Sequence, residues 1–231
     1  MSAYTFHDVG AFFSLGASGG NMTPAMPAFN VNELLLLETG VNSISISPPS
    51  ISGWTKLSPN TNEKGAALYG RIAQLGDTSP TFQWDAGHQA YSRICSFGGD
   101  VYTDLSTIVA TSNDRSANTS GAISVLATGA PALANCMAIR GGRCIKTATN
   151  NGSAFKDWST DVGLYTKVGN TQLVQNGTAM AAALWYWQQT NATATSADGA
   201  QLTNSDTSGN SQGFTVLLKT LTPAPPGMQC L

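Results

Sequence analysis

Charged side chains are scarce in this sequence. Only 10% of the 231 residues are Asp, Glu, Lys or Arg, whereas about a quarter is usual for a globular domain. The 11 Lys and Arg residues form no continuous run, and the net charge is −2. Since phosphate contacts need clustered cations, we predict no nucleic-acid partner. The same scarcity excludes a basic amphipathic helix that would lie on a membrane surface.

Long hydrophobic runs and a recognisable leader are also lacking. The apolar run Leu34–Leu37 is far too short to span a bilayer. Residues 1–8 lack the basic segment that begins a secretory signal. We therefore expect no membrane partner, and we expect synthesis in a cytoplasm without export through a cleaved signal.

Histidine is rare, which limits the catalytic chemistry. A Ser-His-Asp triad would have to use His7 or His88. His88 follows Asp85 in a predicted turn, so it is either a hydrolase base or, more simply, a loop histidine. No Gly-x-Ser-x-Gly motif supplies an activated serine, and the few carboxylates are scattered rather than paired as a glycosidase needs. We expect a protein that is not an enzyme and has no cofactor.

The four cysteines predict no metal site. None has the Cys-x-x-Cys spacing of zinc ligands. Cys95 lies among apolar residues of a predicted strand, which predicts a buried thiol. Cys136 and Cys144 could close a small loop if they were oxidised, although a reducing site of synthesis argues against it.

Short strands and turns are what the sequence does contain. Ser, Thr, Asn, Gln and Gly supply most of the polarity, and hydrophobic residues make up 42% of the chain. Gly- and Pro-containing turns interrupt short apolar or alternating segments about every 8–12 residues, which is typical of a sandwich or barrel. We predict an all-β fold, a single jelly-roll-like antiparallel β-sandwich.

One strand pattern occurs twice, which predicts two pseudo-repeated halves. Each copy has a Trp-bearing turn followed by three short strands. The equivalence of Trp54 and Trp158 in this pattern predicts that both pack in the core. The first copy contains Gly53-Trp54-Thr55, Ala66–Arg71, Pro80–Trp84 and Ala90–Phe97; the second contains Asp157-Trp158-Ser159, Ala182–Trp187, Ala192–Thr195 and Gly213–Leu218.

Periodicity predicts individual strands. Glu33–Glu38 is a continuous apolar run typical of a buried strand, and Val41–Ser47 alternates like a half-buried one. Ala66–Gln74 and Pro80–Trp84 are expected to pair as a hairpin. A strand that begins at Leu133 is expected to end at Gly141-Gly142. Ala179–Gln188 contains residues that favour helices, but its place in the repeat predicts a strand.

These patterns divide the chain into three predicted regions. Residues 29–222 form the sandwich, with pseudo-repeats at about 29–99 and 132–222. Residues 1–28 form an extended N-terminal arm whose apolar residues pack on its own sandwich or on a neighbouring subunit; these are Phe6, Phe12, Phe13 and Leu15. Residues 223–231 form a stiff Pro-rich tail.

The remaining tryptophans are candidates for a contact surface. Trp185 and Trp187 share one face of their predicted strand, and Tyr186 takes the other. Packing between the sheets is the simpler interpretation of these two residues and of Trp84. Any that are exposed would bind a ligand, such as a sugar ring, or another subunit.

Five segments in order resemble a known family. They are the Leu-rich strand Glu33–Leu37, then Ile46–Thr55, which holds a Pro-Pro turn followed by Gly-Trp-Thr, then Ala67–Arg71, Gly76-Asp77 and Pro80–Trp84. This order is similar to a jelly-roll-type β-sandwich module of tailed-bacteriophage virion proteins. Such modules occur in capsid decoration proteins, head fibres and tail fibres, and the resemblance covers roughly residues 29–221.

The resemblance implies a structural role in a virion assembled in the host bacterial cytoplasm. The leading expectation is a non-enzymatic capsid decoration or cement protein on the outside of the head. Its partners would be the major capsid protein or tail proteins, and it would form a homo-oligomer, with a trimer as the first guess. A tail or fibre module that binds host surface glycans is the alternative, and a hydrolase that uses His88 is the second alternative.

Overall fold

The computed structural model describes the N-terminal part of the chain almost completely and the rest in segments. The described residues are 5–16, 19–43, 46–58, 65–84, 87–99, 105, 109–112, 116–118, 122–125, 136–146, 155–160, 166–169, 172–174, 180–189, 200–204 and 209–219. Within them the regular structure is antiparallel β, which confirms the all-β prediction. This part of the chain has no helix long and apolar enough to cross a membrane.

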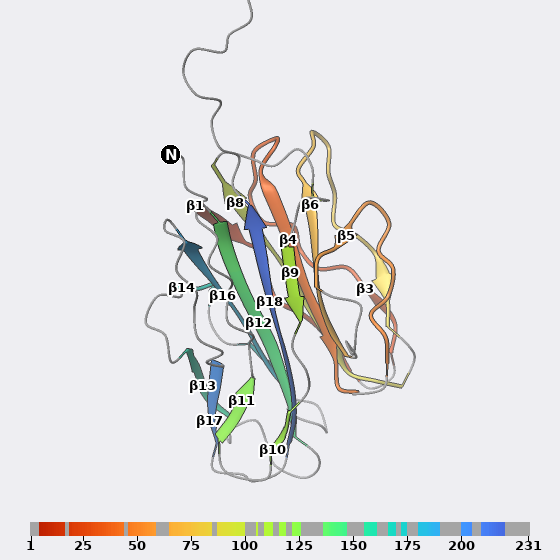
Figure 1. Ribbon diagram of the computed structural model, residues 1–231. Helices are drawn as coiled ribbons and strands as arrows, with labels where there is room; N and C mark the ends of the chain where they lie inside the picture. Colours follow the sequence, from red (N-terminus) through yellow and green to blue (C-terminus); the bar gives the residue numbers. More distant parts are fainter. Residues whose placement is uncertain are drawn as a thin grey trace, which may run out of the picture.

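The first large sheet has six strands, and its central strand is the predicted apolar run. The order is β1-β8-β4-β6-β5, and β2 also pairs with β8 (Figure 1). Every residue of β4 is buried, because both of its faces are covered. The strands are β1 (Thr5–Val9), β2 (Phe13–Leu15), β4 (Leu34–Val41), β5 (Thr55–Lys56), β6 (Ala66–Ile72) and β8 (Ala90–Gly98).

The second large sheet has seven strands around a long central strand. The order is β10-β18-β12-β16-β14, with β15 paired to β16 and β9 paired to β18. The strands are β9 (Val109–Ser112), β10 (Ser116–Asn118), β12 (Cys136–Lys146), β14 (Thr166–Lys167), β15 (Gln172–Val174), β16 (Met180–Gln189) and β18 (Gly209–Lys219). β16 is therefore a strand, as its place in the repeat predicts.

Two small sheets complete the described structure. β3 (Asn21–Met22) pairs with β7 (Phe82–Gln83). β17 (Ala200–Asn204) lies between β11 (Ala122–Val125) and β13 (Phe155–Thr160). Trp158 pairs with Leu202 inside this second small sheet.

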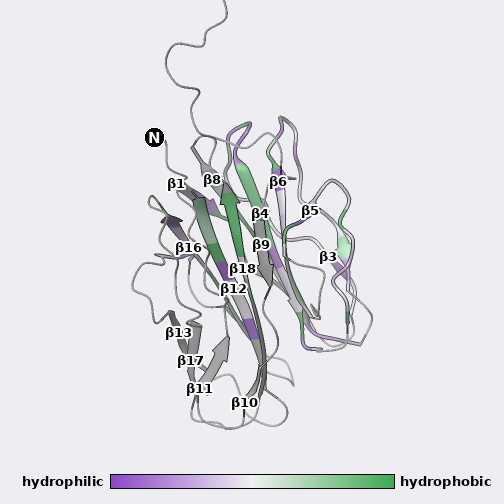
Figure 2. Cartoon of the chain, viewed as in Figure 1, coloured by the Kyte–Doolittle hydropathy of each residue, from purple (hydrophilic) through white to green (hydrophobic). Residues whose placement is uncertain are grey.

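The two large sheets bury an inner core between them. Alternate residues of β4, β8, β12, β16 and β18 meet there, and Figure 2 shows hydrophobic residues along β4, β12 and β18. The inner core contains Leu34, Leu36, Leu57, Leu68, Cys95, Phe97, Met137, Ile139, Val168, Leu184, Phe214, Val216 and Leu218.

The opposite face of the first sheet carries a second apolar layer, the outer core. Leu35, Leu37 and Ile94 project into it from β4 and β8, and Met22 and Phe82 cover them from the small β3–β7 sheet. β4 can thus be apolar at successive positions, since neither face meets water.

A polar cluster interrupts the inner core. Arg93 Nε donates to Glu38 Oε2 at 2.8 Å, and Arg93 Nη1 donates to the carbonyl of Val168 at 2.9 Å. Tyr91 lies beside Glu38. Burial raises the pKa of Glu38, while the charge of Arg93 and hydrogen bonds from Arg93 and Tyr91 oppose the rise. The ion pair stays buried because each charge faces its partner.

Arg143 connects the two large sheets through backbone carbonyls. It projects from β12 and is fully buried. Its Nε donates to the carbonyl of Gly65 at 2.6 Å, and its Nη2 donates to the carbonyl of Ser43 at 2.7 Å. Both acceptors flank strands of the first sheet, so this side chain joins the two halves of the sequence.

Two strand predictions fail for reasons of sheet geometry. β6 and β7 do not form the predicted hairpin, because β4 and β5 already occupy both edges of β6 and β7 pairs with β3 instead. β12 does not end at Gly141-Gly142 but continues to Lys146. The Phe214 ring covers Gly141, where an added Cβ would overlap it.

Three further expectations are corrected by the strand boundaries. The predicted strand Val41–Ser47 does not form. Val41 is the last residue of β4, and residues 42, 43, 46 and 47, which are the other described residues of this range, are not in a strand. Cys136 and Cys144 both lie in β12, so they are about 26 Å apart at 3.3 Å per residue and cannot close a disulfide. Trp54 precedes an edge strand, whereas Trp158 lies within β13, so their positions do not match.

The predicted arm packs on its own sandwich. β1 and β2 pair with β8 and extend the first sheet. Phe6 packs against the inner core beside Phe97 and Tyr186, with ring centroids 5.7 and 6.1 Å away. Phe12 stacks on Tyr91 at 5.6 Å.

Candidate pocket beside the Pro-Pro turn

A tight turn precedes β5 and shapes the candidate site. Pro48 and Pro49 restrict the backbone at its start. Residues 51–54 then form a β-turn in which the N–H of Trp54 donates to the carbonyl of Ile51 at 3.1 Å. Gly53 takes the third position with a φ of 76°, as type II turns require. The turn presents Trp54 immediately before the edge strand.

Side chains of β6 hold this turn in place. The Tyr69 hydroxyl donates to the carbonyl of Pro49. Arg71 lies directly behind Gly53, where a Cβ would be 2.7 Å from its Nη1, and Arg71 forms an ion pair with Asp77. A larger residue at Gly53 would therefore displace Arg71 as well as strain the backbone. The turn is fixed from two sides before any ligand arrives.

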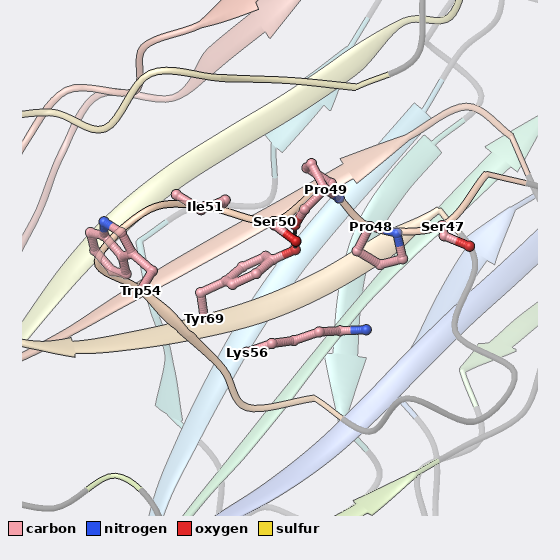
Figure 3. Close-up of a pocket in the computed structure, with 8 residues that line it drawn as sticks. All are labelled: Ser47, Pro48, Pro49, Ser50, Ile51, Trp54, Lys56 and Tyr69. Atoms are coloured by element: carbon pink, nitrogen blue, oxygen red, sulfur yellow. Dashed lines mark hydrogen bonds between the residues drawn. The ribbon is translucent and has the colours of Figure 1, made fainter.

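A pocket of about 390 Å³ opens between this turn and β6 (Figure 3). Its volume falls within the roughly 300–1,000 Å³ range of small-molecule sites. Ser47 and Ser50 are exposed, Trp54 and Lys56 are half-buried, and Ile51 closes the wall from the outer core. The lining is Ser47, Pro48, Pro49, Ser50, Ile51, Trp54, Lys56 and Tyr69.

The described lining supplies groups that can bind a ligand by stacking and by hydrogen bonding. It has an indole, a phenol, two hydroxyls and an ammonium, with no carboxylate, histidine or thiol among these eight residues. An indole offers a flat apolar face, and hydroxyls and an ammonium offer hydrogen bonds. Such a set can hold a ligand that is apolar on one face and polar at its rim.

The tryptophans predicted as contact residues lie elsewhere. Trp84 is 3% exposed in the outer core, and its Nε1 donates to Thr39 Oγ1 at 2.9 Å. Trp185 is 2% exposed, and Trp187 is half-buried further along the same strand. Trp84 and Trp185 have almost no accessible surface, so neither can serve as a stacking platform. The accessible indole beside the pocket belongs to Trp54, which the repeat had assigned to the core.

The four apolar residues of the predicted arm also contact their own chain. Phe6 packs against the inner core, and Phe13 and Leu15 pack against the outer core. Phe12 packs beside Tyr91 and Met180. None of them lies at the pocket.

The described residues around His88 do not form the arrangement that the hydrolase hypothesis needs. His88 is half-buried in the turn after Gly87, and no described carboxylate hydrogen-bonds to it. Its proposed partner Asp85 lies outside the described residues. Among the residues that the structure describes, no group of three or more His, Cys, Asp or Glu is placed to hold a metal ion.

Trp54 and Lys56 could have been found from the sequence by a different signal. The Pro-Pro turn and the Gly at the third position of the next turn predict a rigid loop, and loops carry binding residues. The repeat drew attention to the Trp as a core residue instead. Comparisons with protein-family models, with curated proteins and with solved structures found no match for this chain.

Proposed function

We propose that this chain is a non-enzymatic module of a bacteriophage particle that binds a saccharide in the Trp54 pocket. The virion assignment rests on the resemblance of Ile46–Thr55 and Ala67–Arg71 to jelly-roll modules of tailed phages. The binding assignment rests on one observation: these same two segments, together with Lys56, line the pocket, with Trp54 and Tyr69 on its wall. This proposal is the glycan-binding alternative, with Trp54 as the stacking residue in place of Trp84, Trp185 or Trp187.

The chemistry of a sugar ring matches this wall. One face of a pyranose presents C–H groups with partial positive charge, which favour the negative face of an indole. The ring rim carries hydroxyls. The Ser47 and Ser50 hydroxyls can donate to them or accept from them, and the Tyr69 oxygen can accept from them. Because the turn is already held by Tyr69 and Arg71, binding would require little ordering of the protein.

The matching strand pattern of the two large sheets supports the duplicated sandwich that this proposal assumes. Each sheet has a central strand (β4 or β12) between two long strands (β6 and β8, or β16 and β18) and a short edge strand (β5 or β14). The N–H of Leu57 donates to Leu68, and that of Val168 donates to Leu184, both at 2.8 Å. In this alignment Tyr165, which precedes Thr166, takes the sequence position of Trp54.

A glycan array followed by titration calorimetry tests the saccharide function. We expect the native chain to bind at least one bacterial-surface saccharide, and Trp54→Ala to weaken that binding by at least about tenfold. Trp54→Phe keeps an aromatic face and should retain part of the affinity. Leu75→Ser, at a 91% exposed side chain outside the pocket, is the matched control and should bind normally. Binding unchanged in Trp54→Ala would refute the proposed site.

Capsid decoration remains a second candidate because two large apolar side chains are exposed together. Val31 is 50% exposed and Leu75 is 91% exposed. Their turns are tied by hydrogen bonds from Asn32 N–H to the Ala73 carbonyl and from Ala73 N–H to the Glu33 carbonyl, both 2.8 Å. Exposed apolar side chains on two segments joined by these hydrogen bonds suit contact with another virion protein.

Co-sedimentation with assembled phage heads distinguishes the two candidates. If the chain decorates the capsid, Val31→Ser/Leu75→Ser should reduce its occupancy on heads and leave saccharide binding intact. Trp54→Ala should then show the reverse pattern. Full occupancy of the double variant would remove the support that this pair of residues lends to decoration.

A further inference from the structure

Among the lining residues that the structure describes, Lys56 is the one with a charged side chain. Arg71 lies behind Gly53, and its charge is balanced by the ion pair with Asp77. An ammonium has three N–H donors, so Lys56 can donate to a ligand oxygen beside any contact that it keeps within the protein.

The cation and the indole are separated within the site. In Figure 3 Trp54 lies on one side of Tyr69, and the Lys56 side chain extends beneath Tyr69 towards Pro48, so that its ammonium points away from the indole. The Ser47 hydroxyl lies beyond Pro48 on the same side. The pocket thus has an aromatic end and an end with a cation and a hydroxyl.

Backbone pairing fixes this separation. Lys56 pairs with Tyr69, and Thr55 pairs with Gly70, so the base of the lysine is held in the sheet. Gly70 leaves room for Leu57, since a Cβ at Gly70 would lie 2.7 Å from Leu57 Cδ1. Leu57 anchors the edge strand in the inner core on the face opposite to Lys56.

We propose that the pocket selects a saccharide that bears a carboxylate, as uronic and sialic acids do, over the matching neutral sugar. The ring would stack on Trp54, and the carboxylate would accept a charge-assisted hydrogen bond from Lys56, helped by the Ser47 hydroxyl. This inference rests on the saccharide function proposed above and adds the class of ligand. It follows from the placement of one cation opposite one aromatic face.

The test is a comparison of matched ligands. An oligosaccharide with a terminal glucuronic acid, its glucose counterpart and a sialylated oligosaccharide with its asialo form are titrated into the native chain. We expect each acidic ligand to bind about tenfold more tightly than its neutral counterpart at low salt. The preference should shrink in 1 M NaCl, where charges are screened within about 3 Å.

Variants at Lys56 separate this inference from the general function. Lys56→Met keeps the length of the side chain and should abolish the acid preference while neutral sugars still bind. Lys56→Arg should retain the preference, and thermal unfolding checks that each variant is folded. Equal binding of acidic and neutral sugars by the native chain overturns the acid preference alone. Binding of no saccharide by the native chain overturns both proposals.

Discussion

The two large sheets fill the space over corresponding positions of their central strands with different residues. In the first sheet Glu38 lies between Leu68 on β6 and Arg93 on β8. At the corresponding place of the second sheet, Gly141 lies between Leu184 on β16 and Phe214 on β18. One sheet buries an ion pair across two strands, and the other covers a glycine with an aromatic ring.

The space across the central strand can be filled by an ion pair or by an aromatic ring. Both sheets keep a leucine on the flanking strand and fill the space across the central strand. The apolar version needs only shape, because Phe214 occupies the volume above Gly141. The charged version needs a complete set of partners, since a lone buried charge is far more costly than a missing methyl group.

Removing one member of the buried ion pair should have the largest effect. Arg93→Leu leaves Glu38 buried without its cation, and we expect a loss of about 3–5 kcal/mol in the free energy of unfolding. Glu38→Leu/Arg93→Leu imitates the second sheet and should recover much of that loss. Urea denaturation of both variants provides the measurement. A double variant no more stable than Arg93→Leu would contradict the comparison.

Adding a side chain at Gly141 should have the next largest effect. The new Cβ of Gly141→Ala would overlap Phe214 and lie 2.9 Å from Leu184 Cδ1. Overpacking of this kind costs about 1–3 kcal/mol. The double variant Gly141→Ala/Phe214→Leu should be more stable than the alanine variant alone, as measured by thermal unfolding. Equal stability of the two variants would show that the ring is not what excludes the Cβ.

A smaller effect is expected where the first sheet has a cysteine and the second has a valine. Cys95 pairs with Leu36, and Val216 pairs with Ile139, on the same face of each sheet. Cys95→Val should change the free energy of unfolding by less than about 1.5 kcal/mol. Burial raises the pKa of the Cys95 thiol to about 12. The native thiol should therefore resist a thiolate-specific reagent at pH 8 and react only after unfolding.

The smallest effect on the free energy of unfolding is expected from a change at Glu33, which hydrogen-bonds to His7 of β1. Glu33 accepts from His7 Nδ1 at 2.8 Å and from Asn30. Burial alone would raise the pKa of Glu33, but these hydrogen bonds outweigh it and the pKa lies below its usual value. The contribution to stability is thus present above the unfolded pKa of about 4.5 and is lost as the pH falls through the lower folded value. Glu33→Gln should flatten this acid limb in pH-dependent unfolding; an unchanged slope would contradict the assignment.

Local sequence patterns predicted the strands with the strongest signals. The continuous run at Leu34–Leu37 and the repeat position of Ala179–Gln188 both identified real strands. The expected β6–β7 hairpin failed because pairing depends on which strand edges are already occupied, and that is decided by β4 and β5. The expected break at Gly141-Gly142 failed because Phe214, a distant residue, supplies the packing that glycine lacks.

The pocket was harder to predict than the fold. Its residues come from the Pro-Pro turn, an edge strand and β6, and their convergence depends on the pairing of Lys56 with Tyr69. The sequence identified the turn and the strand separately. It did not indicate that the indole of Trp54 would stay accessible while those of Trp84 and Trp185 became buried. Exposure depends on which segments cover each sheet face.

Arg143 has a consequence for how the chain reaches its folded state. Its donors satisfy the carbonyls of Ser43 and Gly65, which belong to the other half of the sequence. Residues 29–99 made alone would lose both hydrogen bonds from Arg143 and would leave the apolar face of their sheet open to water. We expect the two halves, expressed as separate fragments, to complement each other, and the intact chain to unfold in one cooperative transition.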